Sequence, residues 1–173
     1  MKLLPLLLFL FSGMLLRADP VAPVPAPAWK LKDVDGNVVS SDQFKGKVVV
    51  LDFWATWCGP CRSEIPGYIA LQKEYAADGL VIVGASTNDQ GPDVVKKFVA
   101  DHGMNYQVVV GGEDIAGAFG GVDAIPTTVI INRSGMIVDR KVGAYEESAY
   151  EKLVLDVLKP AAAKPPAQLS TSR

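Results

Sequence analysis

The chain has 173 residues, of which 49% are hydrophobic, and its formal net charge is -2. A chain of this length and composition can bury the core of one globular domain. Because it contains no run of basic residues, we do not expect a nucleic acid as partner. Its two cysteines are too few for the disulfide framework of a small secreted domain.

The N-terminal segment has the pattern of a targeting sequence. Residues 3–16 are almost wholly apolar and follow a single basic residue, Lys2. This length suits the apolar part of a signal peptide and is short for a transmembrane span of about 20 residues. We therefore predict that residues 1–18 form a cleaved signal peptide or a retained membrane anchor. Either alternative places the domain outside the cytoplasm, whereas a third alternative, a buried core helix, does not.

The segments that flank the folded unit are rich in proline. Residues 19–28 alternate proline with small apolar residues, which predicts an extended, polyproline-like linker. If the leader is retained, this linker would hold the domain away from a membrane. Residues 160–173 have no apolar periodicity and are expected to form a disordered tail. The folded domain is therefore expected to span residues 29–159.

Strands and helices are expected to alternate within this domain. Asp35 and Gly36 are typical of a hairpin turn, here between short strands at 29–31 and 38–40. Pro66 is expected to kink or interrupt the first helix. Further strands are expected at 47–55, 80–86, 107–110, 127–132 and 136–142, and helices at 61–77, 92–102, 113–119 and 146–158. This order predicts an α/β fold with a central mixed sheet covered by helices on both faces.

The two cysteines, Cys58 and Cys61, are separated by Gly59 and Pro60. If a helix begins here, as Pro60 favours, Cys58 lies at the positive end of the helix dipole. That position stabilises a thiolate, while Cys61 lies deeper in the first turn and is less accessible. Thiol–disulfide exchange requires this asymmetry, because an exposed thiolate attacks the substrate and a second thiol resolves the mixed disulfide.

Two other interpretations of the cysteine pair are weaker. A purely structural disulfide would remove little chain entropy from the unfolded state, because its loop is so short. A closed zinc site needs two further ligands, whereas the chain has one histidine, His102, and no second Cys-x-x-Cys pair. We therefore expect no metal, and no cofactor beyond a redox-active disulfide between Cys58 and Cys61.

Longer stretches around these cysteines resemble a known family. Residues 46–66, GKVVVLDFWATWCGPCRSEIP, and residues 124–138, AIPTTVIINRSGMIV, are similar to the TlpA/ResA-like branch of the thioredoxin superfamily, of the redoxin or AhpC/TSA type. The leader fits the same branch, and the resemblance covers about residues 29–158. It implies a thioredoxin-like fold with an added N-terminal β-hairpin.

The resemblance also implies roles for single residues. Cys58 corresponds to the attacking thiol and Cys61 to the resolving thiol. Pro126 matches a cis-proline that packs against the active-site disulfide, and such a bond needs a tight local reason because trans is favoured. The backbone beside this proline can pair with an extended substrate segment. The expected substrate-binding residues are Trp57, Gly59, Pro60, Ile125 and Thr127.

Two carboxyl groups compete for the role of proton acceptor from Cys61. Glu64 matches an acidic residue of the ResA-like branch and lies on the same helix face as Cys61. Its alternative is a first-turn glutamate that only favours the helix dipole. Asp52 matches the buried aspartate of thioredoxins, where ResA-like sequences more often carry asparagine. Its strand face is apolar, so burial should raise its pKa unless the position is exposed. Which carboxyl group is the base stays open.

The resemblance implies an enzyme, an extracytoplasmic thiol–disulfide oxidoreductase that reduces protein disulfides, such as those of apocytochrome c or of copper-site cysteines. The Gly-Pro pair matches the reducing type, with a potential of about -270 mV against about -120 mV for a strong oxidant. A membrane electron donor of the CcdA/DsbD type is the implied partner. One alternative is a thiol peroxidase of the peroxiredoxin type, although the Pro–Thr–Cys arrangement of those enzymes is absent. Another is a Cu(I)-binding chaperone that uses both cysteines and His102.

Overall fold

The computed structural model describes residues 24–87 and 91–159. The predicted leader, the first part of the predicted linker and the predicted tail lie outside the described residues. Within them, the strands are β1 (Val24–Pro25), β2 (Lys30–Asp33), β3 (Val38–Ser40), β4 (Val48–Trp54), β5 (Leu80–Ser86), β6 (Gln107–Val110), β7 (Thr127–Ile131) and β8 (Met136–Val142). The helices are α1 (Gly59–Tyr75), α2 (Pro92–Asp101), α3 (Gly112–Ala116) and α4 (Glu147–Leu158), with 3-10 helices η1 (Ser41–Phe44) and η2 (Gly117–Phe119).

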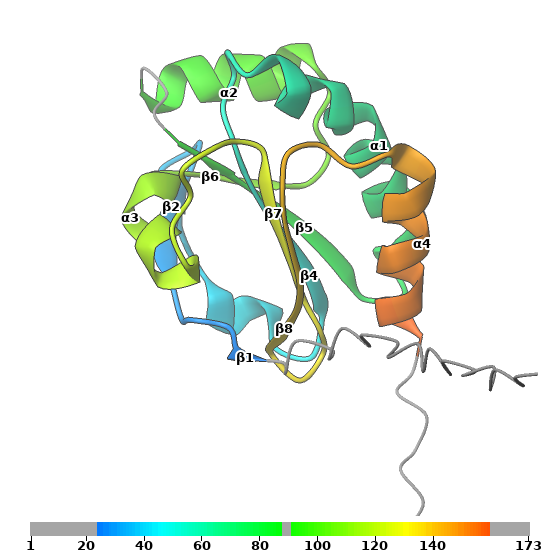
Figure 1. Ribbon diagram of the computed structural model, residues 1–173. Coiled ribbons are helices and arrows are strands. Elements are labelled where there is room, and N and C mark those ends of the chain that lie inside the picture. Colours follow the sequence, from blue (N-terminus) through cyan, green and yellow to red (C-terminus); the bar gives the residue numbers. More distant parts are fainter. Residues whose placement is uncertain (1–23, 88–90, 160–173) are drawn as a thin grey trace, which may run out of the picture.

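The strands form one twisted mixed sheet in the order β1-β8-β7-β4-β5-β6-β2-β3 (Figure 1). Strands β4, β5 and β6 are parallel, while β7 pairs antiparallel with β4 on the other side. The hairpin β2–β3 extends the sheet beyond β6, and its turn has Gly36 at φ 84°. A positive φ is accessible to glycine at little cost, because glycine has no Cβ. The predicted mixed sheet and N-terminal hairpin are therefore confirmed.

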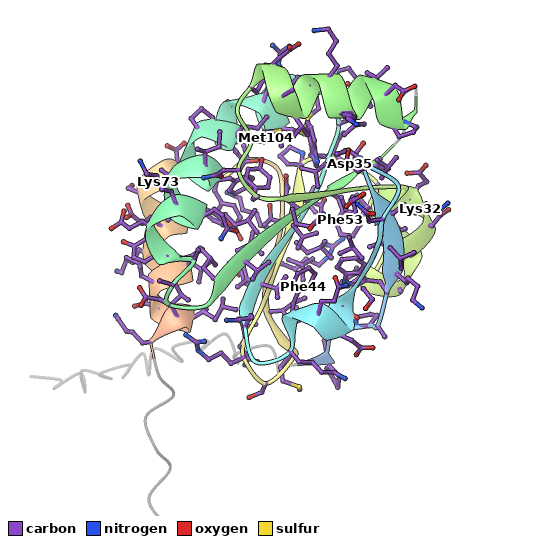
Figure 2. All side chains as sticks on the ribbon, turned by 180° about the vertical axis from the view of Figure 1, so that it is seen from behind. Lys32, Asp35, Phe44, Phe53, Lys73 and Met104 are labelled. Atoms are coloured by element: carbon purple, nitrogen blue, oxygen red, sulfur yellow. A yellow bond between two sulfur atoms is a disulfide. The ribbon has the colours of Figure 1, made fainter. Side chains whose placement is uncertain are left out.

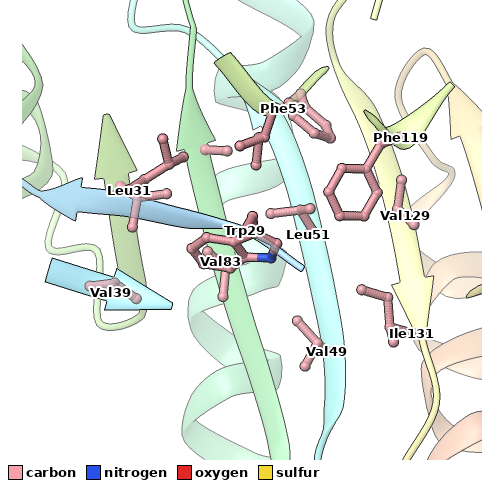
Figure 3. Packing of buried hydrophobic residues seen from close by; sticks show 13 residues of the cluster. Trp29, Leu31, Val39, Val49, Leu51, Phe53, Val83, Phe119, Val129 and Ile131 are labelled. Carbon is pink, nitrogen blue, oxygen red and sulfur yellow. The ribbon is translucent and has the colours of Figure 1, made fainter. Parts of the chain in front are cut away.

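Helices cover both faces of the sheet, as expected (Figure 1). Along β4, successive side chains point to opposite faces, so Val49, Leu51 and Phe53 face one side. They pack with Trp29 and Phe119 in one cluster, whose side chains Figure 3 shows from close by. Residues of α3, η1 and η2 pack on the same cluster. The other face packs against the three longer helices α1, α2 and α4. Figure 2 shows side chains filling both sides, with Phe44 on η1 and Met104 below α2.

Several element boundaries differ from the prediction. Val24 and Pro25 lie in the predicted linker, yet they form strand β1 at the sheet edge, paired with β8. Their backbone finds partners on the exposed edge of β8, and Ala26 N–H donates to the carbonyl of Gly135 at 2.9 Å. Pro66 does not interrupt α1, because Ile65 and Tyr68 on either side of it are buried against the sheet. The helix predicted at 113–119 consists of α3 followed by η2.

Among the residues that the structure describes, no helix combines the length and the apolar character needed to cross a membrane.

Candidate active site

The two cysteines lie where strand β4 ends and helix α1 begins. Cys58 is the N-cap of α1, and its Sγ accepts a hydrogen bond from the backbone N–H of Cys61 at 3.2 Å. Pro60 stands in the first turn, where a missing N–H costs the helix nothing. The sulfur of Cys58 therefore lies at the positive end of a 17-residue helix. This confirms the predicted position, although the helix starts two residues earlier than expected.

Cys58 and Cys61 form a disulfide with an S–S distance of 2.07 Å. Cys61 is 1% exposed and Cys58 is 5% exposed, so the first cysteine is the more accessible, as predicted. Cys58 is nevertheless buried in the disulfide form, and the expected exposed sulfur is not present there. The reason is the approach of the 125–126 segment, whose Ile125 carbonyl oxygen lies 3.8 Å from Cys58 Sγ.

The peptide bond between Ile125 and Pro126 is cis, as the resemblance implied. Pro126 is buried, and its carbonyl oxygen accepts a hydrogen bond from Gly143 N–H at 2.8 Å. Thr127 begins strand β7, and its Oγ1 donates to the carbonyl of Ala124 at 2.7 Å. These bonds fix the loop that carries Ile125 beside the attacking cysteine.

The residues around the disulfide differ in exposure. Trp57 is 62% exposed, and Gly59 and Pro60 are also exposed, so all three are accessible to a partner. Trp54 is 1% exposed and belongs to the core next to Cys61. A Cβ on Gly84 would lie 2.8 Å from Nε1 of Trp54, so the indole requires glycine at that position of β5. Sequence analysis missed Gly84, because only the β4–β5 pairing places it beside the indole.

Asp52 is buried, with 4% of its surface exposed, so the exposed alternative is wrong. It lies on the β4 face that α1 covers, opposite Gly84 on β5 and Thr128 on β7. Oγ1 of Thr128 donates to its Oδ1 at 3.3 Å. Burial raises the pKa of Asp52 well above its ordinary value of 3.8, and the nearby Glu64 carboxylate raises it further.

Glu64 lies in the second turn of α1, because the helix begins at Gly59. It is therefore not the first-turn, dipole-favouring glutamate of the alternative interpretation. Its Oε1 accepts a hydrogen bond from the backbone N–H of Tyr145 at 2.8 Å. Among the described residues, its buried Oε2 has no hydrogen-bond partner. Burial raises the pKa of Glu64, while the Tyr145 bond and Lys141 oppose that rise.

A pocket of about 160 Å³ opens between helices α1 and α4 and is lined by Glu64. Tyr68, Tyr145 and Tyr150 supply the aromatic part of its lining. Sequence analysis missed these tyrosines, which come from α1, the loop before α4, and α4 itself. Burial raises the pKa of Tyr150, while a hydrogen bond with the side chain of Tyr68 opposes that rise.

The hydroxyl of Tyr68 lies 3.4 Å from Oγ1 of Thr128, the residue that donates to Asp52. A continuous set of polar contacts thus runs from Asp52 through Thr128 to Tyr68. Tyr68 belongs to the lining of the pocket, and its hydroxyl also interacts with that of Tyr150. The two candidate acids, Asp52 and Glu64, therefore belong to one region beneath and beside α1.

His102 lies at the C-terminal end of α2, where its ring stacks on Phe98 with the centroids 3.8 Å apart. Its Nδ1 is 2.9 Å from the carbonyl oxygen of Phe98. Nowhere in residues 24–87 and 91–159 do three or more His, Cys, Asp or Glu side chains gather in a group able to hold a metal ion.

Comparisons with known proteins agree with this geometry. The model of the AhpC/TSA family matches residues 23–140. The thioredoxin-like protein YneN of Bacillus subtilis is 36% identical over 133 residues, covering 76% of this chain and 78% of that protein. The thiol-disulfide oxidoreductase ResA of Halalkalibacterium halodurans is 33% identical over 134 residues, covering 76% and 74%.

The fold matches that of solved thioredoxin-family proteins. A thiol:disulfide interchange protein from Chlorobium tepidum superimposes with a TM-score of 0.73 at 36% identity, covering 79% of this chain and 97% of that one. The family match spans well over half of the chain, and it includes both cysteines at the helix N-terminus. This chain therefore belongs to the AhpC/TSA family and is a thiol–disulfide oxidoreductase of the ResA-like branch of the thioredoxin superfamily.

Proposed function

We propose that this oxidoreductase works outside the cytoplasm and reduces the disulfides of protein substrates. The observation that carries the proposal is that the two paired sulfur atoms differ in their position on helix α1 and in their burial. Cys58 Sγ lies at the start of α1, stabilised by the N–H of Cys61, while Cys61 lies one turn deeper and is almost wholly buried. The first sulfur suits attack on a substrate, and the second suits intramolecular resolution.

The reaction begins with the dithiol form. The Cys58 thiolate attacks one sulfur of the substrate disulfide, and a mixed disulfide forms while the other substrate sulfur leaves as a thiolate. Cys61 then loses its proton to a carboxylate, either Asp52 or Glu64, and attacks Cys58 Sγ. The Cys58–Cys61 disulfide of this structure is the product, and the substrate has gained two electrons.

The exposed residues beside the disulfide support a protein as substrate. Trp57, Gly59 and Pro60 offer an accessible surface, and Ile125 offers backbone next to Cys58. An extended substrate segment can pair with such backbone. Apocytochrome c and copper-site cysteines are the substrate classes that the resemblance suggests.

The extracytoplasmic location and the electron source are part of the same proposal. The apolar leader at residues 3–16 supports export or membrane anchoring. In an oxidising compartment, the oxidised pair must be reduced again, and a membrane donor of the CcdA/DsbD type would supply the two electrons. The Gly-Pro pair between the cysteines supports the reducing direction.

Trapping tests this function directly. Replacing Cys61 with serine leaves the attacking thiol but removes the resolving one, so we expect substrate proteins to accumulate as mixed disulfides on Cys58. Cys58→Ser is the matched control and should accumulate none. If cells that express the Cys61→Ser variant contain no covalent adduct on Cys58, the proposed function is wrong.

The equilibrium potential of the cysteine pair tests the direction. We expect a value near or below about -230 mV, measured by alkylation after titration with dithiothreitol. A value between about -180 and -120 mV would make the protein an oxidant or an isomerase instead. Peroxide consumption by the dithiol form should be negligible, and rapid consumption would favour the peroxidase alternative.

A further inference from the structure

We propose that Tyr68 and Thr128 are positioning residues that connect Asp52 to the pocket between α1 and α4. Through them, the proton that Cys61 releases leaves the core on the Glu64 side of α1. This inference rests on the proposed exchange function and deepens it, because it assigns a path to the proton of the resolving step. It also gives Asp52 and Glu64 consecutive roles instead of competing ones.

The contacts that carry this proposal are short and shielded from solvent. Thr128 Oγ1 donates to Asp52 Oδ1 at 3.3 Å, and Tyr68 OH lies 3.4 Å from the same Oγ1. Tyr68 is 1% exposed and Thr128 is wholly buried. A hydroxyl group both donates and accepts, so Thr128 can donate to Asp52 while it accepts from Tyr68. Because solvent does not reach these atoms, no water competes for the two bonds.

The position of Asp52 under α1 explains why such a link is useful. On the same strand face, Val50 packs in one cluster with Tyr68, and Trp54 packs in another with Cys61. Asp52 lies between Val50 and Trp54, at the junction of the two clusters. Tyr68 follows Cys61 by seven residues, about two helical turns, so both side chains face the sheet. Helix α1 thus brings the proton donor to one side of Asp52 and the tyrosine to the other.

The pocket provides the outer end of the path. Oε2 of Glu64 is buried in its lining without a hydrogen-bond partner among the described residues, and the Tyr150 hydroxyl there interacts with that of Tyr68. A space of about 160 Å³ has room for several water molecules, each of which needs about 30 Å³. These atoms are closed to water in this structure, so pocket water joins Tyr68 to the solvent only when a side chain of the lining moves.

Cys61 gives its proton to the Asp52 carboxylate, and the resulting thiolate attacks Cys58 Sγ of the mixed disulfide. The Cys58–Cys61 bond forms, the bond from Cys58 to the substrate sulfur breaks, and the substrate thiolate takes a proton from solvent. Protonated Asp52 then donates to Thr128, whose hydroxyl turns to donate to Tyr68, and Tyr68 passes a proton to Glu64 or to pocket water. Each hydroxyl keeps one proton, and both turn back to restore the bonds of this structure.

Ionisable groups from several elements packed around Asp52 and Glu64 lie close enough to influence the pKa values of these two acids. Those facing Asp52 or Glu64, or lining the pocket beside them, are Tyr68 and Glu74 on α1, Tyr106 before β6, Lys141 on β8, Tyr145 in the following loop, and Tyr150 and Glu151 on α4; Asp139 on β8 bonds to Tyr145. Lys141 is the cation in this set that lowers the pKa of Glu64. All of them stay in place in the variants proposed below, apart from the residue replaced.

The experiment separates attack from resolution with a chromogenic disulfide, 5,5′-dithiobis(2-nitrobenzoic acid). Mixing it in excess with the reduced protein releases one coloured thiolate when Cys58 attacks, at a rate that depends on reagent concentration. A second thiolate is released when Cys61 resolves the adduct, at a rate that does not. Stopped-flow absorbance measures the rate of each phase from about pH 5 to about pH 9. This range covers the pKa values of raised carboxyl groups and of thiols, roughly 5 to 9.

We expect Tyr68→Phe and Thr128→Val to slow the second phase roughly tenfold near neutral pH and to shift its pH profile. A positioned acid–base group contributes roughly 100-fold or more to a rate. Tyr68 and Thr128 only connect such a group to the pocket, so their removal should slow the second phase by less than that. The first phase should be unchanged. Thr128→Ser keeps the hydroxyl and should restore the second phase. Tyr75→Phe removes an outward hydroxyl from the same helix and should change neither phase. In an Asp52→Asn background, Tyr68→Phe should have no further effect.

Three results would overturn the relay. The first is an unchanged second phase in Tyr68→Phe across the pH range, and the second is equal slowing by Thr128→Ser and Thr128→Val. The third is an additive effect of Tyr68→Phe in the Asp52→Asn background. If Thr128→Val does not fold, Tyr68→Phe alone carries the test. Failure of the proposed function is distinguishable, because the Cys61→Ser variant would then trap no substrate in cells while the purified protein still shows both phases with the chromogenic disulfide.

Discussion

Strand β4 has two faces, and the fold uses them differently. Val49, Leu51 and Phe53 pack into a cluster made of apolar side chains (Figure 3). On the other face, Asp52 and the polar groups next to it are buried beneath α1 and α4. The first face contributes stability through burial of apolar surface. The second places ionisable groups where burial raises their pKa values, at a cost in stability.

This difference indicates why the reactive groups gather under the long helices. Helix α1 brings Cys58, Cys61, Glu64 and Tyr68 to the same face of the sheet. Among the described residues, the short helices of the apolar face carry no equivalent set, and the hollow of about 430 Å³ on that face has Trp29, Phe44 and Val49 in its lining. Substitutions on the apolar face should therefore change stability, whereas substitutions on the α1 face should change chemistry as well.

The largest effect on stability is expected for Leu51→Ala on the apolar face. The side chain is 0% exposed, so its truncation leaves a cavity and should lower the free energy of unfolding by about 2 to 5 kcal/mol. Val38→Ala, at a valine that is 55% exposed, is the matched control and should cost less than about 0.5 kcal/mol. Urea titration measures both. Because Leu51 lies on the apolar face, the folded Leu51→Ala variant should keep the rates of attack by Cys58 and of resolution by Cys61. A changed rate would contradict the contrast between the faces.

Asp52→Asn is the corresponding substitution on the α1 face. We expect the free energy of unfolding at neutral pH to rise by about 1 to 3 kcal/mol, because a buried carboxylate that is incompletely paired is removed. The resolving phase should slow by roughly 100-fold, since a positioned base is lost. A variant that is less stable, or that resolves as fast as the unmodified protein, would contradict the role of this face.

The same residue gives the protein a pH-dependent stability. The folded-state pKa of Asp52 is raised above 3.8, so between about pH 4 and that raised value the folded state holds a proton that the unfolded state has lost. Stability is therefore unaffected below the unfolded pKa and decreases as pH rises from about 4 towards the raised folded value. Glu64, whose pKa is also raised, adds to the slope with the same sign. Asp52→Asn should flatten the slope, which urea titrations at several pH values will show.

A smaller effect is expected where the two faces meet, at the end of β4 away from the cysteines. Arg133 donates to the carbonyls of Gly46, Asp78 and Leu158, at 3.3, 2.6 and 3.3 Å. It thereby joins the start of β4 to the end of α4. Because the side chain is exposed, Arg133→Ala should cost about 1 kcal/mol. Lys45→Ala removes an exposed ion pair and should cost less, so equal costs would contradict a special role for Arg133.

The smallest effect on stability is expected for Trp57→Ala. Its side chain is 62% exposed, so the free energy of unfolding should change by less than about 0.5 kcal/mol. The KM for a protein disulfide should rise, while attack on the small chromogenic disulfide stays the same. If both substrates lose rate equally, Trp57 acts on the cysteines themselves and not on docking.

Much of the fold could be predicted because its signals are local. The β-branched and aromatic content of residues 47–55 predicted the buried strand β4, and the Pro60 position predicted the helix start. Resemblance to a family supplied the cis bond before Pro126. Strand β1 was missed, because the pairing of Val24 and Pro25 depends on the edge that β8 offers and not on their own propensity.

The sequence by itself determined which atoms react: a cysteine at a helix start, a second one turn later, and two carboxyl groups near by. Only the tertiary structure decided how those groups are connected. The β4–β7 register sets Thr128 against Asp52, and the packing of α1 brings Tyr68 to Thr128 from 60 residues away. Contacts over such separations depend on strand register and helix packing, which no local periodicity specifies.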